Sequence, residues 1–252
     1  ILYNNETYTL SPKSPGIFEY QFFQPKKSIS FRLISENIAS SPQKLAVLLA
    51  PSILNLNLYV YPPQYTNEPT IKVANSGNST IPEGSTLKWE VFTKSTDTVV
   101  FQHNNSQSFF TKSDQQFSYS KSVSQPLRYS ISTSNTDLKD YETLDYFINV
   151  VKDEPPAIRI KMNRDTTAQE RLYFYGQVSD DYGIRALRLH YFASESPNNI
   201  SVLKLPLTQN NLQEFSYVFP NNLDLIEGAD YSLYFEVIDN DRLHNFKSTR
   251  SR

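Results

Sequence analysis

One pattern repeats along this chain at a nearly constant interval and limits what it can fold into. The motif Phe-x-Tyr occurs at residues 18–20, 117–119 and 215–217, so its copies start 117 − 18 = 99 and 215 − 117 = 98 residues apart. A run typical of a β-strand follows each copy, at residues 31–37, 129–135 and 234–240. A unit of about 100 residues with about seven short strands has the size of an immunoglobulin-like or fibronectin-III-like sandwich. The sequence therefore predicts an all-β fold of tandem immunoglobulin-like (Ig-like) β-sandwich domains.

The same spacing predicts where the domains begin and end. Residues 1–52 match only the C-terminal half of a unit, residues 53–153 match a whole sandwich, and residues 154–252 match a sandwich whose last strand is only beginning. We expect residues upstream of this sequence to complete the first unit.

Alternation within the strands indicates which face of each sheet is buried. In YSLYFEVID (231–239) every second residue, from Tyr231 to Val237, is aromatic or aliphatic. Trp89 alternates with Leu87 and Val91 in TLKWEVF. This spacing predicts that Trp89 belongs to a core rather than to an exposed binding surface.

Composition excludes several classes of function. The chain has no Cys, which excludes disulfides, thiolate metal sites and a cysteine nucleophile. A net charge of −2 without basic clusters argues against nucleic acid, and no apolar stretch is long enough to cross a bilayer, so we expect no membrane contact by this region itself. The three histidines (His103, His190 and His244) lie in unrelated contexts, and no nucleophile, zinc or phosphate-binding motif appears. We therefore predict that the chain is not an enzyme.

Acidic residues cluster at turns that an Ig-like fold would bring together. The loops after RLYFYGQV and YSLYFEVID lie at one end of such a sandwich, where the chain also enters its first strand. We expect six carboxylates to converge there: Asp153, Glu154, Asp180, Asp181, Asp239 and Asp241.

Two interpretations of these acidic residues remain open. Ca²⁺ takes six to eight oxygen ligands, so a structural, interdomain Ca²⁺ site is one of them. The commoner one is turn formation, because Asp and Asn at strand ends accept backbone N–H bonds without any metal. The basic residues Lys152, Arg185 and Arg242 are close enough in sequence to neutralise the acidic residues.

Several segments resemble a known family. They are VSDDYGIRALRLHY (178–191), IPEGSTLKWEV (81–91), DLIEGADYSLYFEVIDND (224–241) and the linker VKDEPPAIRI (151–160). Together they are similar to the repeated Ig-like region of large membrane-anchored envelope proteins of Bacteroidetes, a domain of unknown function. One departure is DRLHNFK (241–247), where a turn containing glycine is expected. The resemblance implies an extracytoplasmic location, in the periplasm or cell envelope, with the membrane anchor in segments outside this sequence.

These observations predict a non-catalytic scaffold and interaction module that spaces and orients other regions and binds a protein partner of the envelope. The alternative is a glycan-binding, adhesive sandwich, because the chain has 17 Tyr and 16 Phe. A surface cluster of coplanar aromatic rings would favour the glycan-binding alternative.

Overall fold

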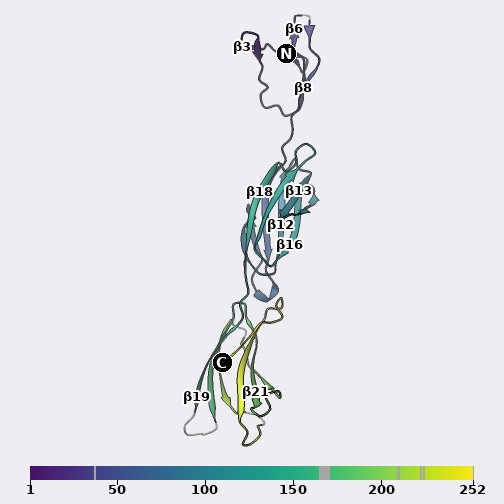
Figure 1. The fold of residues 1–252 in the computed structure, drawn as a ribbon. Helices are drawn as coiled ribbons and strands as arrows, with labels where there is room; N and C mark the ends of the chain where they lie inside the picture. Colours follow the sequence, from purple (N-terminus) through teal and green to yellow (C-terminus); the bar gives the residue numbers. More distant parts are fainter. Residues whose placement is uncertain (37, 165–170, 209–210, 222, 224, 252) are drawn as a thin grey trace. The chain divides into compact units, whose positions relative to one another are not determined.

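A computed structural model describes residues 1–36, 38–164, 171–208, 211–221, 223 and 225–251. Most of these residues lie in strands, and the only helix among them is the short 3-10 helix η1 (Gln64–Thr66). The fold is all-β, with tandem Ig-like sandwiches, as the repeat predicted (Figure 1).

The chain divides into two compact units. One contains residues 1–55, 91–117 and 130–145, and the other contains residues 56–90, 118–129 and 146–252. All residues of the candidate site described below belong to the second unit. The domain boundaries at residues 52 and 153 remain a prediction.

The N-terminal residues form short two-stranded pairs: β1–β2, β3–β4, β5–β8 and β6–β7. Their strands are β1 (Leu2–Tyr3), β2 (Glu6–Thr7), β3 (Ser11–Ser14), β4 (Ile17–Glu19), β5 (Ile29–Phe31), β6 (Ile34–Ser35), β7 (Ile38–Ala39) and β8 (Gln43–Leu45). The run predicted as one strand at residues 31–37 is instead divided between β5 and β6, and residue 37 lies outside the described residues.

Two five-stranded sheets follow, with the orders β10-β9-β12-β16-β15 and β11-β18-β17-β13-β14. Their strands are β9 (Ser52–Tyr61), β10 (Ile71–Ala74), β11 (Ser79–Pro82), β12 (Ser85–Lys94), β13 (Thr98–His103), β14 (Ser106–Phe109), β15 (Thr111–Ser113), β16 (Gln116–Val123), β17 (Leu127–Ser134) and β18 (Glu142–Val151). In β12 every second residue is buried. The β11–β18 pair is parallel and aligns Ser79 with Ile148 and Pro82 with Val151.

Trp89 of β12 is fully buried, as its spacing predicted. Its indole N–H donates to the Tyr129 hydroxyl at 2.7 Å, and that hydroxyl donates to the carbonyl of Gly77 at 2.5 Å. A side chain at residue 77 would meet the Tyr129 hydroxyl at 2.5 Å and the Tyr146 ring at 2.6 Å. Glycine is therefore required at this position for the packing of the two tyrosines.

The last sandwich combines a three-stranded and a four-stranded sheet, with the orders β19-β20-β23 and β22-β21-β24-β25. Its strands are β19 (Ala157–Arg164), β20 (Leu172–Ser179), β21 (Ile184–Ala193), β22 (Ser201–Leu205), β23 (Leu212–Phe219), β24 (Tyr231–Asp239) and β25 (Ser248–Arg250). All neighbouring strands in these two sheets pair antiparallel.

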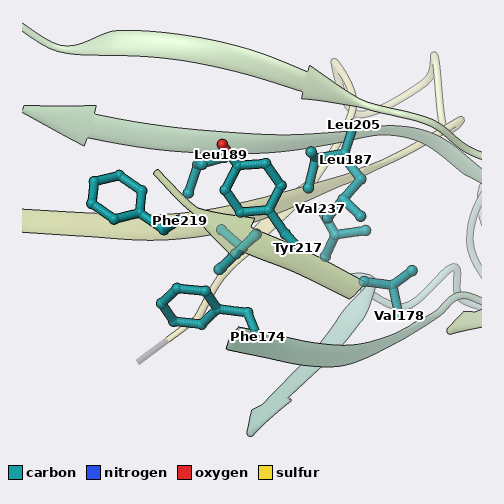
Figure 2. Packing of buried hydrophobic residues seen from close by; sticks show 9 residues of the cluster. Phe174, Val178, Leu187, Leu189, Leu205, Tyr217, Phe219 and Val237 are labelled. Atoms are coloured by element: carbon teal, nitrogen blue, oxygen red, sulfur yellow. The ribbon is translucent and has the colours of Figure 1, made fainter. Parts of the chain in front are cut away.

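A core of aromatic and aliphatic side chains fills the space between these two sheets (Figure 2). Phe235 is 1% exposed and its ring lies 5.3 Å from that of Phe174 and 5.4 Å from that of Phe215. Val237 is fully buried, while Tyr231 and Leu233 are partly buried against the same core. The face predicted from the alternation in residues 231–239 is therefore the inner one.

Candidate functional site

Three of the predicted acidic residues meet at one point of the second unit. Asp153 lies in the linker after β18, Asp239 ends β24, and Asp241 follows two residues later. One carboxylate oxygen from each lies within 4.8 Å of those of the other two. The side chains of Asp239 and Asp241 are fully buried and that of Asp153 is 2% exposed. These three residues are called the aspartate cluster below.

A lysine that sequence reasoning missed lies among these carboxylates. The ammonium nitrogen of Lys247 is 3.0 Å from Asp153 Oδ2, 3.2 Å from Asp241 Oδ2 and 3.9 Å from Asp239 Oδ2. It also donates to the backbone carbonyl of Asp153 at 2.7 Å. One ammonium therefore faces three buried carboxylates.

The backbone brings Lys247 back toward the end of β24 through a tight loop. Asn245 and Phe246 both have positive φ, at 59° and 62°, and the amide of Asp239 donates to the carbonyl of Lys247 at 3.0 Å. The guanidinium of Arg185 lies 3.7 Å above the centre of the Phe246 ring and supports this turn. Asn245 and Phe246 adopt the left-handed conformation where glycine was expected in residues 241–247.

Asp239 and Asp241 also accept backbone hydrogen bonds that shape the turn. Asp239 Oδ1 accepts the backbone N–H of Asp241 at 3.1 Å, and Asp241 Oδ1 accepts that of Leu243 at 2.8 Å. The Nδ1 atom of His244 lies 2.5 Å from Asp241 Oδ2. Turn formation thus uses one oxygen of each of these aspartates and leaves the second oxygen of Asp239 available.

Several oxygens of the aspartate cluster are buried without a hydrogen bond. They are both carboxylate oxygens of Asp153 and Oδ2 of Asp239. Asp153 Oδ2 is within ion-pair distance of Lys247, but the contact lacks hydrogen-bond geometry. A buried acceptor without a partner costs about 1–3 kcal/mol, and more when it is charged. The cluster therefore has more negative charge than the ammonium of Lys247 balances, and more hydrogen-bond acceptors than its donors satisfy.

The pKa values of the cluster reflect this shortage of positive charge. Burial raises the pKa of Asp153 to about 7, although Lys247 opposes the shift. Burial also raises the pKa of Asp239. Burial favours a higher pKa for Asp241 too, but contacts with His244 and Asp153 outweigh it and lower the pKa to about 2. Asp241 is thus the most firmly ionised of the three.

The other three predicted acidic residues do not join the aspartate cluster. Asp180 accepts the backbone N–H groups of Tyr182 at 3.1 Å and Gly183 at 2.7 Å, so it shapes its own turn. Burial raises its pKa to about 6. Asp181 and Glu154 are exposed, and the Glu154 amide donates to Asp181 Oδ2 at 3.4 Å. Metal binding by the predicted set remains a prediction.

Two of the three predicted neutralising residues, Lys152 and Arg185, have other partners. Lys152 pairs with Glu83 at 2.6 Å, and Glu83 Oε1 is also 3.7 Å from Nε2 of His244. Arg185 stacks on Phe246 as described. Glu83 precedes β12 in the sequence and was not predicted as part of the site. Its side chain is 7% exposed, and no sequence motif marks its proximity to His244.

A shallow hollow beside the loop is lined in part by Tyr65, Asn240, Arg242 and Leu243, but by none of the three clustered aspartates. The cluster is therefore closed off from this hollow.

His190 pairs with Glu236 at 3.0 Å inside the sheet and stacks on Tyr234. These contacts are structural and do not resemble an acid–base pair in a cleft.

An aromatic group near the N-terminus bears on the glycan-binding alternative. The rings of Tyr3 and Tyr8 stack on each other at 4.8 Å, and the rings of Tyr20 and Phe22 meet Tyr3 in edge-to-face contacts. Stacked and edge-to-face rings do not form the coplanar surface that would favour glycan binding. The arrangement gives the glycan-binding alternative no support.

Comparison with protein families gives one match. The model of the Domain of unknown function (DUF4175) matches residues 36–223. The chain belongs to this family. Asp153, Asp180 and Asp181 fall inside the part matched by the DUF4175 model, whereas Asp239, Asp241 and Lys247 lie beyond it. No curated protein sequence matches the chain.

Three solved structures show a distant likeness to the chain. A chimeric titin Z1Z2-Z1Z2 tandem is 9% identical, with 80% of this chain and 96% of that chain covered and a TM-score of 0.28. Domains A168–A170 of titin are 11% identical, with 100% and 82% covered and a TM-score of 0.27. A chain from a cytokine receptor complex is 6% identical, with 63% and 87% covered and a TM-score of 0.22. Within the described residues, no helix has the length and apolar character needed to cross a membrane.

Proposed function

We propose that this chain is a non-catalytic structural and interaction module of a bacterial envelope protein of the Bacteroidetes type. It spaces and orients the regions that flank it and binds a protein partner. The observation that carries the proposal is the attachment of the linker: Asp153 is held to the loop after β24 by Lys247, through contacts at 2.7 and 3.0 Å. A linker fixed by buried charges suits a spacer, because it limits the directions that the chain can take.

The proposed location of the module is the periplasm or cell envelope. A chain without cysteine tolerates an oxidising compartment, and the resemblance to membrane-anchored envelope proteins supports a place in the periplasm or cell envelope. In this proposal the module is anchored by other segments of the whole protein.

The partner binds through loops or sheet edges. β19, β23, β22 and β25 are the edge strands of the last sandwich and offer backbone groups for strand addition.

A replacement experiment separates spacing from partner binding. In the whole protein, residues 53–252 are exchanged for an unrelated pair of Ig-like domains of equal length, and growth and envelope integrity are compared with a deletion of the same residues. Function retained by the exchange but lost in the deletion supports spacing. Function lost in both, with normal protein levels, supports recognition of a partner by this surface. Equal function in all three strains contradicts both parts of the proposal.

Location is tested separately with a protease added to intact and to permeabilised cells. Degradation of this region only after the outer membrane is opened, with a cytoplasmic control protein still protected, supports a periplasmic place. Protection until the inner membrane is lysed contradicts an extracytoplasmic module.

A further inference from the structure

The aspartate cluster combines three features that turn formation does not require. Its three carboxylates bring one oxygen each within 4.8 Å of the others. Ligand atoms on opposite sides of a Ca²⁺ ion are about 4.6–5.2 Å apart, since Ca–O distances are about 2.3–2.6 Å. The spacing of these oxygens is therefore compatible with one shared Ca²⁺ ion.

The second feature is the set of acceptors without donors. Asp239 is fully buried and its Oδ2 has no hydrogen bond, and neither carboxylate oxygen of Asp153 has one. Two of these oxygens, Oδ2 of Asp153 and Oδ2 of Asp239, lie 3.0 Å and 3.9 Å from the ammonium nitrogen of Lys247. The oxygen donors are hard ligands of the kind that Ca²⁺ prefers.

The third feature is the accessibility of the lysine. The side chain of Lys247 is 20% exposed, whereas those of the three aspartates are at most 2% exposed. Lys247 is therefore the member of the group that can withdraw toward water on its flexible stem. Its departure would leave the three carboxyl groups around one position that no lysine occupies.

We propose that the aspartate cluster is a Ca²⁺ site in which the ammonium of Lys247 and the metal ion compete for the same position. Asp153, Asp239 and Asp241 supply the protein ligands, and water supplies others once Lys247 has withdrawn. At low Ca²⁺ the lysine balances part of the negative charge. The inference is independent of the proposed envelope role, because it concerns only residues within one compact unit.

The test compares the wild-type 252-residue chain with Lys247→Met, which keeps the length of the side chain but removes its charge. Ca²⁺ is titrated by calorimetry. Tb³⁺, a luminescent substitute for Ca²⁺, is titrated while tyrosine is excited. Tyr65 can transfer its excitation to a bound Tb³⁺ ion, because it lies close enough to interact electrostatically with Asp241 and Asp153. Removal of the competing charge should tighten Ca²⁺ binding by at least about tenfold.

Two control variants make the test specific. Lys152→Met removes a neighbouring lysine that pairs with Glu83 rather than with the cluster, and it should leave Ca²⁺ binding unchanged. Asp239→Asn keeps an oxygen to accept the Asp241 amide but loses the charge, and it should abolish the Tb³⁺ signal. Mg²⁺ should compete weakly, because it demands a tighter octahedral shell.

The possible outcomes decide the proposal. Tighter binding in Lys247→Met together with loss in Asp239→Asn supports it. Absence of Tb³⁺ and Ca²⁺ binding in both the wild type and Lys247→Met overturns it, and the lysine is then the only cation of the cluster. If Lys247→Met folds only when Ca²⁺ is present, the metal replaces the lysine, as proposed. If it folds under neither condition, Tb³⁺ binding by the wild type that Asp239→Asn lacks supports the site, and equal signals overturn it.

Discussion

Replacing Lys247 by Met in the absence of divalent cations should destabilise the last sandwich strongly. Removing one partner of a buried ion pair costs about 3–5 kcal/mol, because the remaining charge is left without compensation. Here one ammonium lies within 3.9 Å of three carboxylates whose side chains are at most 2% exposed. The lysine is itself 20% exposed, so water screens part of its contribution, and we expect about 3 kcal/mol near pH 8.

The loss should depend on pH in a definite direction. The pKa of Asp153 is already raised from 3.8 to about 7, and removing Lys247 should raise it further. At pH values between the pKa of Asp153 in the unfolded state and its higher pKa in the folded state, the folded protein binds more protons than the unfolded protein. Stability from this group is therefore present at low pH and is lost as pH rises. The variant should lose less stability near pH 5, where Asp153 is protonated, than near pH 8.

Differential scanning calorimetry in EDTA measures this effect, because it resolves the melting of separate domains. The single tryptophan, Trp89, is in the core of the middle region and serves as an internal reference for melting there. Lys152→Met is the matched control, with an expected change within about 1 kcal/mol, since its lysine is half exposed. A loss below about 1 kcal/mol in Lys247→Met, or an equal loss at both pH values, would refute the reasoning.

Three further changes test other parts of the structure. Phe235→Ala should cost about 3–5 kcal/mol in denaturant unfolding followed by far-UV circular dichroism, because it empties the centre of the last core; a cost below about 1 kcal/mol would contradict that packing. Asp180→Asn keeps the oxygen that accepts the turn hydrogen bonds but removes a carboxyl group whose pKa is about 6. The decline in melting temperature from about pH 4 to about pH 6 should therefore become shallower in this variant, and an unchanged slope would exclude Asp180 as a source of the decline. Gly77→Ala should lower the melting temperature measured by Trp89 fluorescence, since the added methyl meets the Tyr129 hydroxyl at 2.5 Å, whereas Gly16→Ala, with open space around it, tests only backbone strain.

The all-β fold could be predicted because its signal is local and repeats. The three Phe-x-Tyr motifs lie in or at the end of β4, β16 and β23, and the alternation in residues 231–239 identifies the inner face of β24. The N-terminal region was harder, because its strands are two to four residues long. So short a strand shows too few alternations to define a period.

Three of the six predicted acidic residues do meet, but neither the exclusion of the other three nor the charge balance of the site could be predicted. Asp239 and Asp241 end a clear strand pattern, and Asp153 lies in the linker that contains Pro155 and Pro156, so fold topology alone brings them close. Lys247 depends instead on two consecutive residues of positive φ, at Asn245 and Phe246, which no glycine signals in the sequence. A long flexible side chain whose direction is set by such a turn leaves no periodic pattern for sequence analysis to find.

The parallel pairing of β11 with β18 bears on how this region responds to mechanical force. Residues 79–82 and 148–151 run side by side in the same direction, and the amide of Glu83 continues the pairing to the carbonyl of Val151 at 2.9 Å. A pull on the chain beyond Val151 acts along these strands and across their hydrogen bonds. The bonds are then sheared together rather than opened one after another from an end. Tension leaving through the linker at Asp153 therefore loads β18 along its length, where it is hydrogen-bonded to β11 on one side and to β17 on the other.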